Sequence, residues 1–235
     1  MLDRSGSVAL VSGASRGIGA SIARKLVEDG WRVSLGARQP ETLGNTLEAG
    51  SGVLHARYDA EDAGADAAWV QETLHRWGRI DALVNNAGVV LPFTVEDDDE
   101  TNLDRTLEIN VKAPLRLARL CLPYLRQVDA GRIINISSLS GKRVKNDNVA
   151  YAMSKHSVVA MTHALRKAGW EDGVRASVIC PSFVSTDLTA TVTKVAQEEM
   201  TSPHDLAELV GTVLQLPNQA NVAELIVNCR CEDIY

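Results

Sequence analysis

The sequence has no run of roughly 18 consecutive apolar residues, the length that a membrane-spanning helix requires. Its first residues lead directly into a short apolar run and do not form a signal peptide. The chain also lacks a basic tract, and its net charge is −6. We therefore expect a cytoplasmic protein that binds neither a membrane nor nucleic acid.

Cysteine is scarce as well. The four cysteines are Cys121, Cys180, Cys229 and Cys231, and without a secretory signal they do not indicate a disulfide framework. Cys229 and Cys231 form a CxC pair, but one pair without a second Cys or His cluster falls short of a zinc site. We predict no metal site and ordinary core or strand-end thiols; a metal or redox role for the pair is the alternative.

The composition is that of a globular chain, 45% hydrophobic and 23% charged, which excludes disordered and collagen-like proteins. Short β-rich runs alternate with longer helical runs along the sequence. The predicted strands are Val8–Val11, Arg32–Gly36, Val53–Tyr58, Ile80–Asn85, Arg132–Ser137, Arg175–Cys180 and Val222–Val227. The predicted helices are Ile18–Asp29, Glu41–Ala49, Ala63–Trp77, Leu103–Val128, Ala150–Ala168 and His204–Leu216.

Seven strands separated by crossover-length helices predict parallel pairing, because parallel strands cannot be joined by tight hairpins. Right-handed crossovers then place helices on both faces of a doubly wound α/β sheet. No linker rich in Pro, Gly or Ser interrupts the pattern, so we predict one domain over residues 1–235. Ligands of such sheets bind beyond the carboxyl ends of the strands.

A glycine-rich turn, residues 12–19, follows the first predicted strand and opens the first helix. Such a turn lets the backbone approach a pyrophosphate, and the helix amino terminus favours its negative charge. The glycines stand at 13, 17 and 19, which is not the G-x-G-x-x-G spacing. A nucleotide site and a purely structural turn therefore both remain open.

The residues after the second strand bear on the identity of the nucleotide. An NAD site places a carboxylate there to bind the ribose 2′-hydroxyl, whereas an arginine accommodates a 2′-phosphate. This strand leads into Arg38, no acidic residue follows until Glu41, and Arg16 adds a second permanently charged guanidinium. We predict NADP(H), with NAD(H) as the alternative, and arginines that only solvate the loop as the simpler explanation.

Tyr151 and Lys155 are four residues apart, so they share one face of a helix. Tyrosine, with a pKa of about 10, is a poor base at neutral pH. A nearby cation would lower that pKa toward the range useful for proton transfer. Ser138 ends the fifth predicted strand and could donate to a substrate oxygen. Asn110 lies inside a predicted helix, where asparagine is a poor helix former, and an exposed polar position is the simpler explanation.

Together these residues resemble the short-chain dehydrogenase/reductase family, in its single-domain branch. The matching motifs are the glycine run at 12–19, Asp59, Asn85–Gly88, Asn110, Ser138, and Tyr151 with Lys155. Their order along the chain is far more specific than any one of them. The resemblance implies a Rossmann-type fold and an oxidoreductase that interconverts a small carbonyl compound and its alcohol by hydride transfer.

The resemblance also implies roles for single residues. Tyr151 is expected to be the catalytic acid or base, and Lys155 to lower its pKa and bind the nicotinamide ribose. Ser138 is expected to orient the substrate oxygen, and Asn110 to hold a water that connects Lys155 to solvent. With Arg38 from the argument above, the expected cofactor-binding residues are Gly13, Ser15, Arg16, Gly17, Ile18, Gly19, Arg38, Asp59, Ala60, Asn86, Ala87, Gly88, Tyr151, Lys155, Pro181, Val184 and Thr186.

Two departures from the family pattern stand out. The usual Pro-Gly after the sixth strand is Pro181-Ser182 here, and this side chain is expected to reshape the nicotinamide edge or the lid. The last fifty residues match loosely and resemble the subgroup that acts on 3-hydroxy acids, serine and related small molecules. The alternatives to an oxidoreductase are a non-redox enzyme on the same fold, such as an epimerase or dehalogenase, and a cofactor-sensing protein that has lost its chemistry.

Substrate choice is expected to come from loops over 89–93, 139–149 and 183–196, with 188–200 as a mobile lid. Lys142, Arg143 and Lys145 either attract an anionic substrate or, the simpler explanation, are solvated loop charges. Family members pair their two long helices, so we also predict a homodimer or homotetramer. The residues that would serve that contact or the core are Leu115, Ala118, Leu122, Val158 and Met161.

Overall fold

The computed structural model describes residues 1–232, and its centre is a parallel sheet of seven strands in the order β3-β2-β1-β4-β5-β6-β7. The strands are β1 Val8–Ser12, β2 Arg32–Ala37, β3 Val53–Arg57, β4 Ala82–Asn85, β5 Arg132–Ile136, β6 Arg175–Pro181 and β7 Glu224–Val227. Every predicted strand is present, and none of its ends differs from the prediction by more than two residues. The predicted parallel pairing is confirmed for all six neighbouring pairs.

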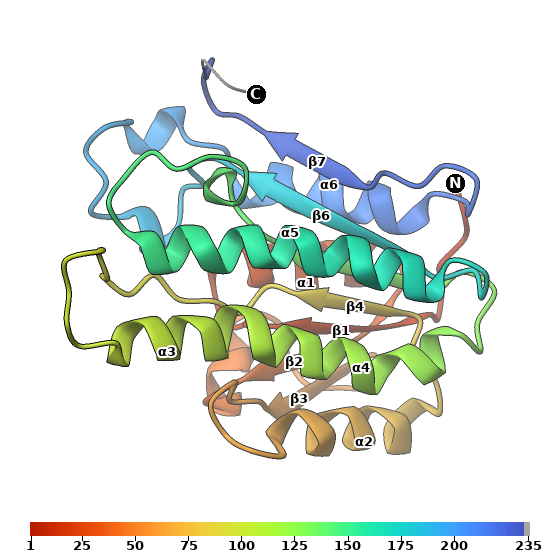
Figure 1. Ribbon diagram of the computed structural model, residues 1–235. Helices are drawn as coiled ribbons and strands as arrows, with labels where there is room; N and C mark the ends of the chain where they lie inside the picture. The colour runs from red at the N-terminus through yellow and green to blue at the C-terminus, as the bar shows by residue number, and fades with distance from the viewer. Residues whose placement is uncertain (233–235) are drawn as a thin grey trace.

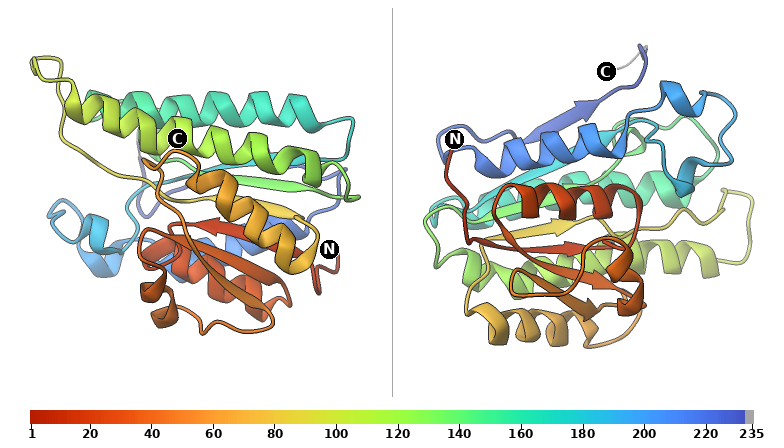
Figure 2. Two further views of the ribbon diagram at one scale, coloured as in Figure 1. Left: turned by 90° about the horizontal axis from the view of Figure 1, so that it is seen from below. Right: turned by 180° about the vertical axis from the view of Figure 1, so that it is seen from behind.

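Helices cover both faces of the sheet, as Figures 1 and 2 show. The helices are α1 Gly17–Glu28, α2 Ala65–Trp77, α3 Thr101–Leu107, α4 Ala113–Leu125, α5 Val149–Gly169 and α6 Pro203–Gln215. Helices α2, α4 and α5 pack on one face, and α1 and α6 on the other. The predicted doubly wound α/β fold is therefore confirmed. None of the described helices is both long enough and apolar enough to cross a membrane.

The central strands β1, β4 and β5 are mostly apolar because both of their faces are covered. In β1, Leu10 packs toward α2 and α4, whereas Ala9 and Val11 pack toward α1 and α6. The strands β4 and β5 alternate in the same way. Because both faces are buried, these strands appear in the sequence as short apolar runs and not as alternating apolar and polar residues.

Two predicted helices differ from the structure. The segment predicted as a helix over 41–49 is a short 3-10 helix, η1 Pro40–Asn45. The long helix predicted over 103–128 is divided into α3, a π-helical turn η2 Glu108–Lys112, and α4. Pro114 explains the division, because it has no N–H to give to the carbonyl of Asn110 and its ring would clash there. The turn widens instead, and the N–H of Ala113 bonds to the carbonyl of Glu108, five residues earlier.

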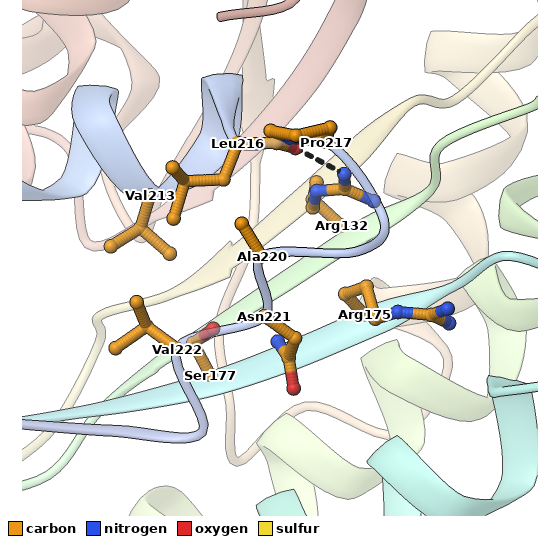
Figure 3. A pocket seen from close by; sticks show the side chains of 9 residues that line it. All are labelled: Arg132, Arg175, Ser177, Val213, Leu216, Pro217, Ala220, Asn221 and Val222. Carbon is orange, nitrogen blue, oxygen red and sulfur yellow. Dashed lines mark hydrogen bonds between the residues drawn. The ribbon is translucent and has the colours of Figure 1, made fainter.

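The amino edge of the sheet is closed by three buried arginines, Arg4, Arg132 and Arg175. Arg132 donates to the carbonyl of Leu216 and to Oδ1 of Asn218, which fastens the loop after α6 (Figure 3). The small pocket drawn in Figure 3 leaves no room for a water molecule. Burial, and then the charges of Arg4 and Arg175, lower the pKa of Arg132 to about 9. This edge holds the fold together, and the ligand-binding edge is the opposite one.

Gly36, in β2, lies directly against the Trp69 ring, so a substitution at this position tests how tightly the core is packed. A Cβ at this position would lie 2.7 Å from a ring carbon of Trp69. The ring is buried and its Nε1 donates to Oγ of Ser34 at 2.8 Å, so it has little freedom to move. We expect Gly36→Ala to lower the free energy of unfolding by about 1–3 kcal/mol, measured by urea denaturation with circular dichroism.

Gly44→Ala is the matched control, because no atom lies within 4 Å of the added methyl group. Its free energy of unfolding should change by no more than about 0.5 kcal/mol. Equal stabilities of the two variants would contradict a fixed Trp69 ring.

Candidate active site

The predicted site residues come from distant parts of the sequence and gather at the carboxyl edge of the sheet. The strand arrowheads in Figure 1 point to this edge. Strand order reverses between β1 and β4, since the chain first winds outward to β3 and then returns to β4. Open α/β sheets bind their ligands at such a reversal.

The glycine turn after β1 is packed too tightly for any other residue. Gly13 has φ 65° and Gly17 has φ 55°, both in the left-handed region. A Cβ at Gly13 would lie 2.9 Å from Cα of Ala87, and a Cβ at Gly19 would lie 2.3 Å from the carbonyl oxygen of Gly13. The glycines therefore allow two segments of backbone to come into close contact. We call this turn, Gly13–Gly19 with the uncapped amino terminus of α1, the glycine cradle.

Polar bonds lock this turn to the segment after β4. Nδ2 of Asn86 donates to the carbonyl oxygens of Ser12 and Gly13 at 3.0 and 3.1 Å. In return, Oγ of Ser12 accepts from the backbone N–H groups of Asn86 and Ala87, both at 3.0 Å. The turn and the segment 85–88 thus form one rigid unit.

Thr46 also holds the turn, although no sequence pattern points to it. Its buried hydroxyl donates to the carbonyl oxygens of Ala14 and Ser15 at 3.0 and 3.2 Å. Thr46 follows η1, so the segment predicted as a helix folds back onto the turn instead. A side-chain contact over thirty residues of chain leaves no local pattern in a sequence.

The cradle fits the pyrophosphate of a dinucleotide. No side chain caps the amino terminus of α1, so the first N–H groups of the helix remain available to an anion. Arg16, at this end, pairs with Asp187 at 3.2 Å, and both side chains are 73% exposed. An ion pair this exposed contributes little stability and is readily exchanged for another partner.

Arg38 stands at the end of β2 with its side chain exposed, and it makes no hydrogen bond or ion pair with the described residues. Glu61 lies within its electrostatic reach but is held by Arg105, whose Nε and Nη2 donate to it at 2.8 and 2.9 Å. The Arg105 hydrogen bond is the main reason that the pKa of Glu61 is lowered. Arg38 is therefore a guanidinium free to bind an anion.

Tyr151 and Lys155 lie on the first turns of α5, as predicted. Asn148 caps this helix, accepting from the N–H of Tyr151 at 3.1 Å and donating to the carbonyl of Leu91 at 2.8 Å. Ser138 lies just before the short 3-10 helix η3 Leu139–Gly141, and its side chain is near enough to Tyr151 to lower the pKa of the phenol. The structure therefore brings Ser138 and Tyr151 together.

Burial sets the protonation of both ionisable groups. It raises the pKa of Tyr151, and the Ser138 side chain opposes that rise. It lowers the pKa of Lys155 to about 8. Nζ of Lys155 lies 5.6 Å from the centre of the Tyr151 ring and donates to the carbonyl of Ile136 at 3.0 Å. In this arrangement Tyr151 carries its proton at neutral pH.

Asn110 is 2% exposed, so its interpretation as an exposed polar residue is wrong. It lies in the π-helical turn η2, where its Oδ1 accepts from the N–H of Val89 at 2.8 Å. Its Nδ2 donates to the carbonyl of Val89 at 2.9 Å and to Oγ of Ser154 at 3.1 Å. Asn110 thus links α5 to the segment after β4, and the widened turn that presents it is typical of functional sites.

The remaining predicted cofactor residues surround this core. Oδ1 of Asp59 accepts from the N–H of Glu61 at 3.1 Å, and Ala60 is buried beside it. Val184 forms a bridge with Thr201, and a Cβ at Gly17 would lie 3.2 Å from Cγ2 of Thr186. The segment that follows β6 and precedes the predicted lid therefore lies against the glycine turn.

Ser182, the residue in place of the usual glycine, has a clear structural role. Its N–H donates to the carbonyl of Val227 at 2.8 Å, and its Oγ accepts from the N–H of Cys229 at 2.9 Å. The side chain therefore continues the β6–β7 pairing by one more bond. It ties Cys229, in the segment 228–232 that follows β7, to the segment after β6.

The cations before Tyr151 are ion-paired, so the explanation as solvated loop charges is wrong. Lys142 pairs with Glu224 of β7 at 2.6 Å, and Arg143 and Lys145 pair with Glu232 at 2.7 and 2.6 Å. Among the cysteines, Cys121 and Cys180 are buried, Cys229 is half-buried and Cys231 is exposed. The described residues contain no group of three metal-ligating side chains.

Comparison with known proteins agrees with this geometry. The family model described as short chain dehydrogenase matches residues 7–197. An agropine synthesis reductase of Rhizobium rhizogenes is 44% identical over 97% of this chain and 54% of its own length. An oxidoreductase of Staphylococcus saprophyticus is 32% identical over 97% of this chain and 99% of its own. This chain spans about half the length of the agropine synthesis reductases that it matches.

Solved structures give the same result. A variant of actinorhodin polyketide ketoreductase, solved with NADPH, is 29% identical and superposes with a TM-score of 0.86 over 97% of this chain and 98% of its own. A dehydrogenase/reductase of Sinorhizobium meliloti is 28% identical, with a TM-score of 0.87 over 96% and 94%.

The glycine cradle yields a direct binding test. We expect Gly19→Ala to weaken NADPH binding by roughly tenfold or more, because its methyl group would enter the space of the Gly13 carbonyl and displace N–H groups aimed at the phosphates. Binding is measured by the fluorescence of NADPH titrated against protein.

Gly52→Ala serves as the control, since no atom lies within 4 Å of its added methyl group. Unchanged affinity of a correctly folded Gly19→Ala protein would show that the cradle does not hold the cofactor.

Proposed function

Because this chain belongs to the short-chain dehydrogenase/reductase family and is an NAD(P)-dependent reductase, we propose that it uses NADP(H) to interconvert a small carbonyl compound and its alcohol. The observation that carries this proposal is the buried Tyr151, with Ser138 near enough to lower its pKa and Lys155 close to its ring, at the edge that also holds the glycine cradle. Tyr151 and its neighbours supply proton transfer, and the glycine cradle supplies a binding position for the dinucleotide.

The nicotinamide, when bound, supplies or accepts the hydride at the substrate carbon. In the reductive direction Ser138 donates a hydrogen bond that orients the carbonyl oxygen. The Tyr151 hydroxyl then gives its proton to that oxygen, and the alcohol forms with Tyr151 left as phenolate. The charge of Lys155 stabilises this phenolate. In the oxidative direction the same phenolate removes the alcohol proton.

The protonation of Tyr151 favours reduction. Its pKa is raised by burial, so the group is a proton donor at neutral pH and does not start as a base. The relatives named as agropine synthesis reductase and ketoacyl reductase are reductases too. Asn110, bonded to Ser154 on α5, is placed to support a path that restores the proton through Lys155.

Tyr151→Phe tests this assignment because it removes the transferred proton and keeps the ring. We expect NADPH affinity to be retained and kcat/KM for carbonyl reduction to fall by about 10²–10⁴-fold. Turnover is followed by the loss of NADPH absorbance.

Tyr124→Phe is the control, since Tyr124 lies beside Gly78 and Arg79, away from the glycine turn and Tyr151. A wild-type rate in Tyr151→Phe would exclude Tyr151 as the acid.

Arg38 supports the preference for NADP(H). It lies where an acid would bind a ribose 2′-hydroxyl, and it has no other partner among the described residues. A ketoreductase of the same fold binds NADPH in its crystal structure. Arg16 adds charge on the same side once it leaves Asp187.

We expect Arg38→Ala to lower the ratio of kcat/KM with NADPH to kcat/KM with NADH by roughly tenfold or more, the effect of one lost charge-assisted hydrogen bond. Arg76→Ala on α2 is the control, because Arg76 is exposed and bonds only weakly to the carbonyl of Gly50 at 3.3 Å. An unchanged ratio, or a wild-type preference for NADH, would contradict the assignment.

The oligomeric state and the number of domains remain predictions. The family resemblance predicts a homodimer or homotetramer through α4 and α5, and the absence of a linker rich in Pro, Gly or Ser predicts a single domain over residues 1–235. The agropine synthesis reductases are about twice as long as this chain, so their full activity is not carried over to it.

A further inference from the structure

Arg143 and Lys145 lie in the loop that joins the two proposed catalytic elements. This loop begins after η3, next to Ser138, and ends at the cap of α5, three residues before Tyr151. Both of its ends are anchored. The N–H of Arg143 donates to the carbonyl of Leu139 at 3.0 Å, and Asn148 bonds to Tyr151 and Leu91. The two cations are therefore held at a fixed place beside the reaction centre.

These cations already hold a carboxylate, which belongs to the protein itself. Oε2 of Glu232 accepts from Nη2 of Arg143 at 2.7 Å and from Nζ of Lys145 at 2.6 Å. Nε of Arg230 lies 3.7 Å from Oε1 of the same group. The Glu232 side chain is 2% exposed, so it sits inside this cationic pocket and not on its surface.

Glu232 leaves one hydrogen-bond donor of its pocket, Nε of Arg143, unpaired within the part of the chain that the structure describes. Nε of Arg143 is buried, and neither it nor Oε1 of Glu232 has a hydrogen-bond partner among residues 1–232. Guanidinium and carboxylate groups bind most strongly when two parallel N–H···O bonds form. Glu232 reaches Arg143 through one oxygen alone, which leaves room for a carboxylate that is placed better.

Glu232 is easier to displace than Arg143 and Lys145, because its segment is held less firmly than their loop. Residues 228–232 follow β7 and contain neither helix nor strand. Cys229 bonds to Oγ of Ser182 at 2.9 Å, and Arg230 reaches the carbonyl of Lys194 at only 3.4 Å. Lys142 is separate from this exchange, because it pairs with Glu224 in β7.

We propose that Arg143 and Lys145 form a subsite for a carboxylate of the substrate, and that Glu232 fills this subsite until the substrate displaces it. The proposal rests on the proposed function, because it makes the carbonyl substrate of Tyr151 an oxo acid. It also gives the segment 228–232 a role as an internal competitor that leaves when the correct substrate enters.

The kinetic test compares oxo acids with their methyl esters, which differ mainly in the charge. Acetoacetate, 4-oxopentanoate and 5-oxohexanoate place the carboxylate at three distances from the carbonyl. The wild-type protein should prefer at least one acid over its ester in kcat/KM. In the variant Arg143→Gln/Lys145→Gln, this acid-to-ester ratio should fall by roughly tenfold or more.

Glu232→Gln separates a competitor from a structural support. If Glu232 competes with the substrate, this variant lowers KM for the acid and raises the acid-to-ester ratio several-fold. If Glu232 only holds the loop in place, acid and ester lose activity together and the ratio stays constant, which overturns the proposal. Glu72→Gln, an exposed site on α2 with the same change in charge, is the control.

Hydrogen–deuterium exchange provides a measurement that does not need turnover. Glutarate should speed exchange in residues 228–232 of the wild-type protein, compared with sodium chloride at equal ionic strength, which accounts for screening. In Arg143→Gln/Lys145→Gln, exchange there should be fast with or without glutarate. Unchanged wild-type exchange at saturating glutarate would overturn the proposal.

The two measurements separate this proposal from the function on which it rests. Release of the segment by glutarate without reduction of any carbonyl compound would keep the carboxylate site and reject the reaction. Equal reduction of acids and esters, with no response to glutarate, would keep the reaction and reject the subsite.

Discussion

The contact between the end of β1 and the segment after β4 is the constraint on which the site depends. Four hydrogen bonds join Ser12 and Gly13 to Asn86 and Ala87 here, and Gly13 allows the two backbones to approach. Because strand order reverses at this point, the contact also defines the crevice above the sheet. The same segment continues to Val89, whose backbone is bonded to Asn110. One rigid junction thus positions both the cradle and the residues near Tyr151.

Most of the fold was predictable because its signals are local. Buried strands are short apolar runs, the glycine turn lies within eight residues, and Tyr151 and Lys155 are one helical turn apart. One error arose from a distant contact and the other from a local proline. Thr46 folds η1 back onto the glycine turn, and the widened turn at Asn110 follows from a proline four residues later. That proline was a readable signal for the end of a regular helix.

Burial gives the two ionisable groups at the site a common tendency toward neutrality. The pKa of Tyr151 rises and that of Lys155 falls to about 8, so the resting protein does not favour a phenolate–ammonium pair. A buried pair of that kind would have to overcome the desolvation of both charges. The proton therefore rests on the phenol, and the charge of Lys155 matters most after that proton has left. This order of events is the one that carbonyl reduction requires.

The two edges of the sheet use their arginines in opposite ways. At the amino edge, Arg132 bonds to the backbone carbonyl oxygen of Leu216 and to the side-chain amide of Asn218 inside the fold. At the carboxyl edge, Arg16 pairs with Asp187 of the short 3-10 helix η4 Asp187–Thr189, and Arg143 pairs with Glu232 in the irregular segment 228–232. A carboxylate on a segment with few anchors can be replaced by an anion that enters from solution, whereas a backbone carbonyl of the core cannot. The carboxyl edge therefore keeps Arg16 and Arg143 paired in the resting protein and available when ligands bind.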